Sequence, residues 1–251
     1  MLRVRWLFFD LGDTIWRSST PESRRAAGLY PKVGQRMADW LRARGHQRLP
    51  EGAALAEPVW EEVDAAARRC EGDTMSEADL GAAAQCALAR LGLTITVDDG
   101  RALWELAQAP APERGAILLE DAPETLGALK QKGVRLGIIT NRTFGEAFTR
   151  RDLSALGLDG LFEHVIVSSD VGYLKPHPRI FQAALSAAGA RPQECALVGD
   201  NMRADVQGAQ DAGLRAIWLR SPRTASDRPV TPDATIDRLL ELLDLVEPIR
   251  S

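Results

Sequence analysis

From Asp121 onward, short apolar segments alternate with helical segments that each end at a glycine. Apolar segments of this length, rich in branched residues, are predicted to be buried strands. Glycine just past the last helical residue is the usual C-terminal stop. The pattern predicts helices at 123–132, 144–156, 178–188 and 203–212, and strands at 134–139, 164–167, 195–198 and 215–219. Strands that alternate with helices connect through right-handed crossovers, so we expect a parallel sheet with helices on both faces.

A further strand at the start of the chain belongs to this sheet. The run 4–9 is too short for a helix, rich in aromatic and branched residues, and ends abruptly at Asp10. We also expect a loop at 221–233, a short edge strand at 234–236 and a closing helix at 238–246. The fold class is therefore α/β, with a doubly wound parallel sheet.

The segment between the first strand and the later alternation is predicted to be all-helical. Apolar residues recur at helical spacing in four stretches, 31–44, 54–70, 80–91 and 98–106, before Pro110 and Pro112 interrupt the pattern. We expect a core domain made of residues 1–14 and 118–251, and a helical insert at 15–117. Trp40, Trp60 and Trp104 fall on helix faces and are expected in the core of the insert.

Composition excludes several classes of partner. A net charge of -4 gives no general attraction to nucleic acid or to an anionic membrane. No apolar run approaches the ~20 residues that span a bilayer, and no signal peptide is expected, so a cytoplasmic protein is predicted. Three widely spaced cysteines and three scattered histidines favour neither a disulfide nor a zinc site. The oligomeric state stays open.

Polar residues follow four of the predicted strands at the point where each strand ends. They are Asp10, Thr140 with Asn141, Lys175, and Asp200. Thr140 and Asn141 alone would be typical of a plain turn, and Lys175 alone could be a solvated loop lysine. Because the carboxyl ends of parallel strands meet in one crevice, the four positions together predict a site.

These motifs resemble those of the haloacid dehalogenase-like hydrolases. The resemblance rests on Asp10-Leu-Gly-Asp-Thr14, Ile139-Thr140-Asn141, the segment from Val171 to Pro178 that contains Lys175, and Gly199-Asp200 followed by Asp205. It spans the whole α/β block and implies a Rossmann-like core. The helical insert directly after the first motif resembles the type-one cap of that family, which covers the crevice and selects the substrate.

The resemblance also implies a role for each motif residue in hydrolysing a small phosphorylated substrate. Asp10 would attack phosphorus and form an aspartyl-phosphate. Mg²⁺ would be held by Asp10, Asp200 and the Gly12 backbone carbonyl. Thr140, with the amides around Asn141, would bind the phosphoryl oxygens, and Lys175 would screen Asp10 from the substrate. Asp205 would hold Lys175 or a metal-bound water; the less favoured alternative is a first-turn helix acid that interacts with the helix dipole.

One position departs from the family pattern. Phosphatases of the family usually carry an aspartate at the position of Gly12 to protonate the leaving group, and here the carboxylate comes one residue later, as Asp13. General acid catalysis contributes roughly 10²- to 10⁴-fold, so the shift matters. Three explanations are open, in this order: substrates with good leaving groups, an Asp13 that reaches the site, or a weak enzyme. Asp13 could instead be a turn residue that binds nearby amides.

The same residues are compatible with two other functions. A catalytically silent protein that binds a phosphorylated ligand or a partner is favoured by Gly12 alone. A 2-haloacid dehalogenase, which needs no metal, also lacks the second aspartate, but its last motif lacks the acid that Asp200 supplies.

In the insert, eight basic residues between positions 17 and 48 could favour an anionic substrate. Arg17 is the candidate substrate contact among them, because it lies just past the first motif.

Overall fold

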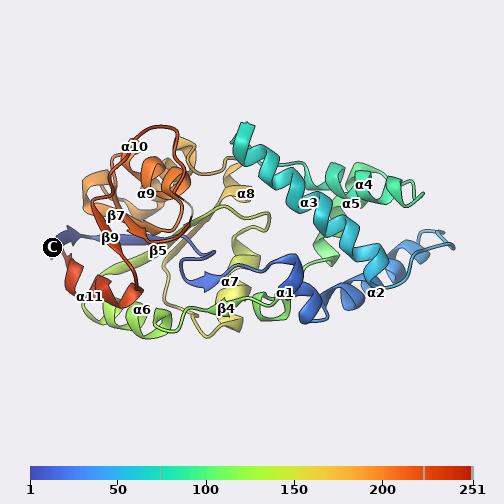
Figure 1. Ribbon diagram of the computed structural model, residues 1–251, viewed down its shortest axis with the longest axis horizontal. Coiled ribbons are helices and arrows are strands. Elements are labelled where there is room, and N and C mark those ends of the chain that lie inside the picture. Colours follow the sequence, from blue (N-terminus) through green and yellow to red (C-terminus); the bar gives the residue numbers. More distant parts are fainter. Residues whose placement is uncertain (74, 223, 250–251) are drawn as a thin grey trace. The chain divides into compact units, whose positions relative to one another are not determined.

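The computed structural model describes residues 1–73, 75–222 and 224–249. The chain divides into two compact units, one of residues 1–18 with 117–251 and one of residues 19–116. The first unit is the α/β part and the second is helical (Figure 1). The boundaries fall at Ser18 and Ile117, a few residues inside the predicted insert.

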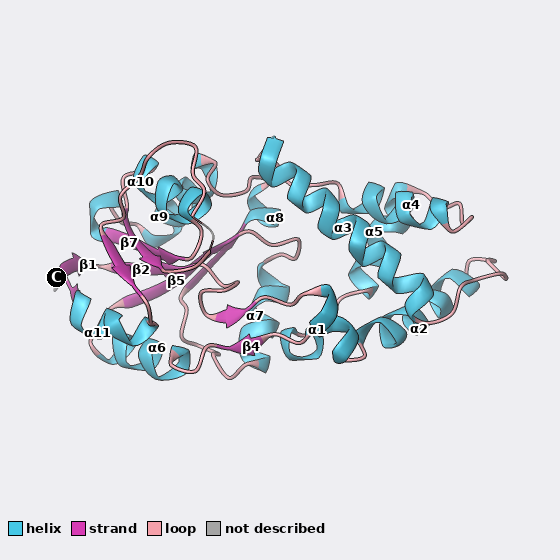
Figure 2. Cartoon of the chain, in the orientation of Figure 1, coloured by secondary structure: helices cyan, strands magenta, loops and turns pink. Residues whose placement is uncertain are grey.

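A six-stranded sheet forms the centre of the first unit (Figure 2). The strand order is β6-β5-β2-β7-β8-β9, and every neighbouring pair is parallel. The strands are β2 (Trp6–Phe9), β5 (Arg135–Thr140), β6 (His164–Val167), β7 (Cys195–Gly199), β8 (Arg215–Leu219) and β9 (Ala234–Ile236). The predicted α/β class and parallel sheet are therefore confirmed. Chain order reverses beside β2, so the ends of β2, β5 and β7 meet at the switch point where ligands bind in such sheets.

Helices cover both faces of this sheet. One face carries α6 and α7, and the other carries α9 and α10 (Figure 1). The helices of this unit are α6 (Ala122–Gln131), α7 (Glu146–Ala155), α8 (Ser168–Val171), α9 (Pro178–Ala188), α10 (Gly208–Asp211) and α11 (Leu242–Leu245). Short 3₁₀ turns lie at η2 (Pro192–Glu194) and η4 (Leu239–Glu241). Trp6 and Phe8 point into the apolar cluster under α9, since alternate residues of a strand face opposite sides.

Several elements differ from the sequence prediction. The first apolar run is divided by Arg5 into β1 (Leu2–Val4) and β2, and β1 pairs with β10 (Val246–Pro248) in a separate two-stranded parallel sheet. The predicted closing helix is correspondingly shorter. The helix predicted from 203 begins as a π-helix, η3 (Met202–Gln207), which continues into α10. The short helix α8 was not predicted.

A small antiparallel ribbon of β3 (Trp16–Arg17) and β4 (Ile117–Leu118) lies where the chain leaves and re-enters the α/β unit. The insert was predicted without strands, so these two segments at its ends are a correction. Each strand is only two residues long, too short to leave an alternating pattern in the sequence.

The second unit consists of helices packed on their apolar stripes. They are α1 (Pro21–Ala26), α2 (Leu29–Arg42), α3 (Ala53–Asp73), α4 (Leu80–Arg90), α5 (Val97–Leu106) and the 3₁₀ turn η1 (Ala111–Arg114). Four of them were predicted, and α1 was not. Trp60 and Trp104 are buried in edge-to-face contact, with ring centroids 4.7 Å apart, as expected for core residues. The prediction was wrong for Trp40, which is only half-buried and lies under the Arg44 guanidinium group. Within the described part of the chain, no helix combines the length and apolar character required to cross a membrane.

Candidate active site

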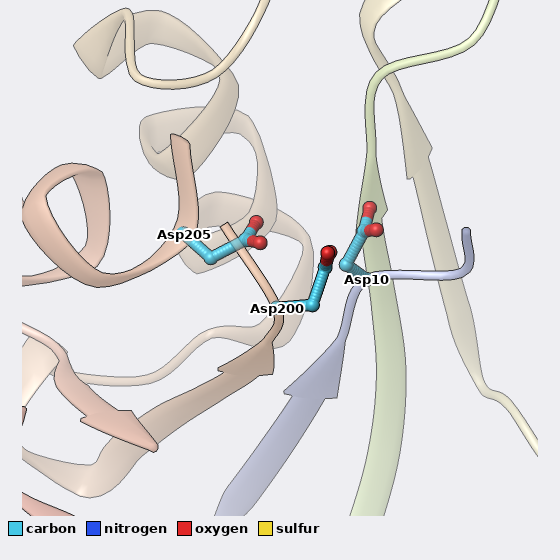
Figure 3. A group of neighbouring side chains, drawn as sticks. All are labelled: Asp10, Asp200 and Asp205. Atoms are coloured by element: carbon cyan, nitrogen blue, oxygen red, sulfur yellow. The ribbon is translucent and has the colours of Figure 1, made fainter. Parts of the chain in front are cut away.

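Three carboxylates gather at the carboxyl ends of β2 and β7. Asp10 follows β2, Asp200 follows β7, and Asp205 lies in η3; one oxygen of each lies within 4.8 Å of the others (Figure 3). Asp200 and Asp205 are buried, and the side chain of Asp10 is 14% exposed. The parallel register of β2 and β7 brings Asp10 and Asp200 side by side, and the Asp10 amide donates to the Val198 carbonyl at 2.9 Å. A set of oxygen donors of this kind suits a hard divalent cation.

Lys175 connects two of these carboxylates to the sheet. Its ammonium group donates to Asp10 Oδ1 at 2.8 Å, to Asp205 Oδ1 at 2.6 Å and to the Ile139 carbonyl at 2.8 Å. The side chain is 2% exposed. Burial alone would lower the pKa of Lys175, but the charges of Asp10 and Asp205 outweigh it and raise that pKa above its usual range. The lysine therefore remains a fixed positive charge beside Asp10.

Asp205 is held in place by the backbone at the end of β7. Its second oxygen accepts from the Asn201 amide at 3.0 Å, while the Asn201 side chain accepts from the Arg203 and Ala204 amides and caps η3. Burial raises the pKa of Asp205, the charge of Lys175 opposes that rise, and Asp10 adds to it. The wide turn of η3 is of the kind that often occurs at functional sites.

Gly199 makes room for this carboxylate. A Cβ atom at Gly199 would lie 2.3 Å from the Asp205 carboxyl carbon, so any side chain there would displace Asp205. The sequence interpretation took Gly199 only as part of a motif and missed this role. The glycine directly before Asp200 was the available signal, since a glycine at a strand end often marks a close approach of another group.

Thr140 and Asn141 lie at the end of β5, next to Lys175. Thr140 is 2% exposed and is the last residue of the strand. The Asn141 side chain accepts from the Lys175 amide at 2.7 Å and donates to the Lys175 carbonyl at 3.1 Å. This reciprocal pair fixes the backbone of Lys175. Asn141 thus contacts the lysine motif directly, in addition to the substrate role predicted for it.

The loop after Asp10 places Gly12 and Asp13 differently. Asp13 has a left-handed backbone with φ of 57°, which aspartate tolerates better than most residues. One of its carboxylate oxygens accepts from the Ser18 amide at 3.0 Å, so the side chain closes the loop. Gly12 carries no positive φ, but a Cβ there would lie 2.5 Å from the Ser18 hydroxyl oxygen.

Arg17 lies on β3 and pairs with Ile117 through its backbone. Its side chain is exposed and makes no hydrogen bond or ion pair with any residue that the structure describes. The structure therefore brings Asp10, Asn141, Lys175, Asp200 and Asp205 together, with Thr140 at the adjoining strand end. It does not tie Arg17 to this group.

The model of one hydrolase family matches residues 4–213, which include the whole insert and the α/β unit from the end of β1 to α10 but not β8 or the elements after it. The chain is a haloacid dehalogenase-like hydrolase. This assignment confirms the resemblance derived from the motifs and agrees with the parallel α/β core described above.

Known members of the family differ in the reactions that their names describe. The chain is 37% identical to a phosphoserine phosphatase of Thermus thermophilus over 139 residues, or 55% of each protein. It is 35% identical to a glyceraldehyde 3-phosphate phosphatase of Pyrococcus furiosus over 129 residues, which are 50% of this chain and 53% of the relative. Its match thus spans about half the length of these curated relatives.

Among solved structures, a 2-haloacid dehalogenase from Pseudomonas syringae matches with a TM-score of 0.62 and 26% identity. That match covers 98% of both chains, so the similarity includes the helical insert as well as the α/β core.

Proposed function

We propose that this protein is a Mg²⁺-dependent phosphatase of small phosphorylated metabolites, acting through an aspartyl-phosphate on Asp10. The observation that carries the proposal is the placement of Asp10 beside a buried lysine and two further carboxylates at the carboxyl ends of β2 and β7. Curated relatives that carry phosphatase names support it, although they match over only about half of their length. The partner implied is a small phosphorylated molecule.

The residues present fit a magnesium ion. Asp10, Asp200 and Asp205 supply oxygen ligands from one small region, and the Gly12 carbonyl would add a fourth. When bound, the cation would neutralise negative charge and let the anionic Asp10 approach an anionic phosphate. Asp205 also binds Lys175, so we assign it first to holding the lysine and second to the metal.

The side chains of the protein have distinct tasks in this reaction. Asp10 attacks the phosphorus atom in line with the leaving oxygen, and water later hydrolyses the acyl phosphate. Thr140 and the amides near Asn141 bind the phosphoryl oxygens. Lys175 stabilises the negative charge that develops on those oxygens, since a buried fixed cation acts strongly in a site shielded from water. The helical unit is proposed as the cap that selects the substrate and excludes water.

Protonation of the leaving group is the step at which this chain departs from the family pattern, because Gly12 stands where an acid is usual. Asp13 is committed to the Ser18 amide through one oxygen, which favours a structural role in the loop. We therefore propose substrates with good leaving groups, such as acyl, aryl or anomeric phosphates. A dehalogenase is less well supported, because Asp200 and Asp205 supply acids that attack on carbon does not need.

The test is hydrolysis of para-nitrophenyl phosphate with and without Mg²⁺. We expect metal-dependent release by the wild type, loss in Asp10→Asn, and a raised Mg²⁺ requirement in Asp200→Asn. Asp237→Asn is the matched control, since Asp237 is an exposed acid paired with Arg220 on the surface. Wild-type protein that releases no nitrophenol at any Mg²⁺ concentration would refute the proposal. 2-Haloacids and ligand binding would then be tested.

A further inference from the structure

Arg142 follows the Thr140-Asn141 motif, and its side chain turns into the protein. The guanidinium group forms an ion pair with Asp152 and donates to Thr149 Oγ1 at 3.3 Å, both on α7. The Arg142 side chain is 11% exposed and that of Asp152 is fully buried. None of these residues was singled out by the sequence motifs.

The backbone of Arg142 is fixed as well. Its amide donates to the Ser168 hydroxyl at 2.9 Å, and that hydroxyl lies 3.4 Å from the Arg142 carbonyl oxygen, to which it donates. Ser168 is fully buried at the start of α8. The segment just after Thr140 is therefore held at its main chain and at its side chain.

The guanidinium group also lies near the loop that follows Asp10. The Arg142 carbon Cζ lies 5.6 Å from the centre of the Trp16 ring, within the range of a cation–π contact. Trp16 is 5% exposed and pairs with Gly12. Its carbonyl accepts from the Asp13 amide. Trp16 is thus a structural part of the nucleophile loop.

A buried ion pair is weak evidence for stability, because desolvation of both charges offsets their attraction. The ion pair matters here because it holds the Arg142 side chain in one position. Arg142 contacts α7, α8 and Trp16 at once, and it is separated from Thr140 by one residue. Its contact with Trp16 links the segment directly after Thr140 to the ring of Trp16.

We propose that Arg142 is a positioning residue that sets the distance between the phosphate-binding segment at Thr140 and the nucleophile loop at Asp10. This inference rests on the proposed phosphatase function and deepens it. With the planar guanidinium over Trp16, a phosphoryl group bound at Thr140 stays in line with Asp10. Without it, the two segments are still joined by the pairing of β2 with β5 and by Lys175, but the residues after Thr140 lose their contact with Trp16, and phosphate binds less tightly.

The experiment uses Arg142→Lys, which can keep an ion pair with Asp152 but has no planar group to stack on Trp16. Calorimetry measures the affinity of the full chain for inorganic phosphate in Mg²⁺, and kinetics measure KM and kcat for para-nitrophenyl phosphate. We expect phosphate affinity to fall roughly 3- to 30-fold, the range that a cation–π contact spans. The Mg²⁺ half-saturation should not change, because none of the three carboxylates contacts Arg142.

Trp16→Leu should weaken phosphate binding to a similar degree, and the double variant should be no weaker than either single one, since both remove one contact. Arg150 lies on α7, the helix that Arg142 contacts, and is paired with Glu146. Arg150→Lys is the matched control and should bind phosphate as the wild type does. Additive losses, or a lower Tm with unchanged phosphate affinity, would overturn the proposal. Calorimetry keeps it distinct from the proposed function, whose failure would appear as absent turnover by the wild type.

Discussion

The position of Gly12 permits a sharp test of the missing proton donor. In Gly12→Asp the new Cβ would lie 2.5 Å from the Ser18 hydroxyl oxygen but 3.9 Å from the Ser18 Cβ. The hydroxyl must therefore rotate or shift, at a cost of about 0.5–1.5 kcal/mol for an unfavourable rotamer. In a chain of this size that corresponds to a Tm lower by roughly 1–6 °C.

The double variant Gly12→Asp with Ser18→Ala removes that conflict. The remaining Cβ–Cβ distance is an ordinary contact, and Gly12 has no positive φ that a side chain would strain. We expect the double variant to regain the Tm of Ser18→Ala. Calorimetric melting of the four proteins, in the same buffer without substrate, measures this part of the argument.

Activity tests the chemical part. A carboxyl group at position 12 should raise kcat/KM for an alkyl phosphate by roughly 10²-fold or more, the lower range of general acid catalysis. It should change little for para-nitrophenyl phosphate, whose leaving group needs no proton. Asp13→Asn, in the wild-type background, should leave the ratio of the two substrates unchanged. If that substitution selectively abolished alkyl phosphate hydrolysis, Asp13 would be the proton donor and the reasoning would fail.

Three further predictions concern buried ionisable groups. Lys175→Met, in EDTA, should cost about 3–5 kcal/mol. In this variant the charge of Lys175 no longer opposes the rise in the pKa of Asp205 that burial causes, and the protein loses stability as pH rises through that pKa. The loss should therefore be larger at pH 7 than at pH 5, and equal losses would contradict this. Burial raises the pKa of the Cys195 thiol to about 12, so iodoacetamide at pH 8 should label exposed Cys86 and spare Cys195 in mass spectra of the native protein. Arg24→Met, which removes the ion pair of buried Arg24 with half-buried Asp64 in the helical unit, should cost about 3 kcal/mol in urea unfolding, and a change below about 0.5 kcal/mol would show that the pair adds nothing.

The sheet and its crevice could be predicted because each strand is a short apolar run that ends in a polar residue. Asp10, Thr140 and Asp200 mark those ends directly, and parallel pairing then brings them together. The roles of these residues in catalysis remain predictions, as does the function of the insert. The position of Lys175 beside Asp10 and Asp205 was implied by the family resemblance and not by the strand pattern, because Lys175 comes from a loop after β6.

Other features left no readable pattern. The pairing of β1 with the last residues of the chain joins segments more than 240 positions apart, and neither is long enough to alternate. The ion pair of Arg142 with Asp152 looks, in sequence, like ordinary charges near a helix. The space beside Gly199 is filled by the carboxyl group of Asp205, six residues later. The wide turn of η3 sets the direction of that side chain, and the sequence does not show it.

The bonding of Lys175 has a consequence for how charge moves during turnover. An ammonium group has three donors, and all three are occupied, by Asp10, Asp205 and the Ile139 carbonyl. No donor is left over for an incoming phosphate. In the proposed reaction, however, the Asp10 carboxylate loses its negative charge when its oxygen bonds to phosphorus and becomes a poorer acceptor, while the attached phosphoryl group keeps its anionic oxygens. The hydrogen bond to Asp10 can therefore follow the negative charge onto the phosphoryl oxygens, and the lysine becomes available to the substrate only as the bond to phosphorus forms.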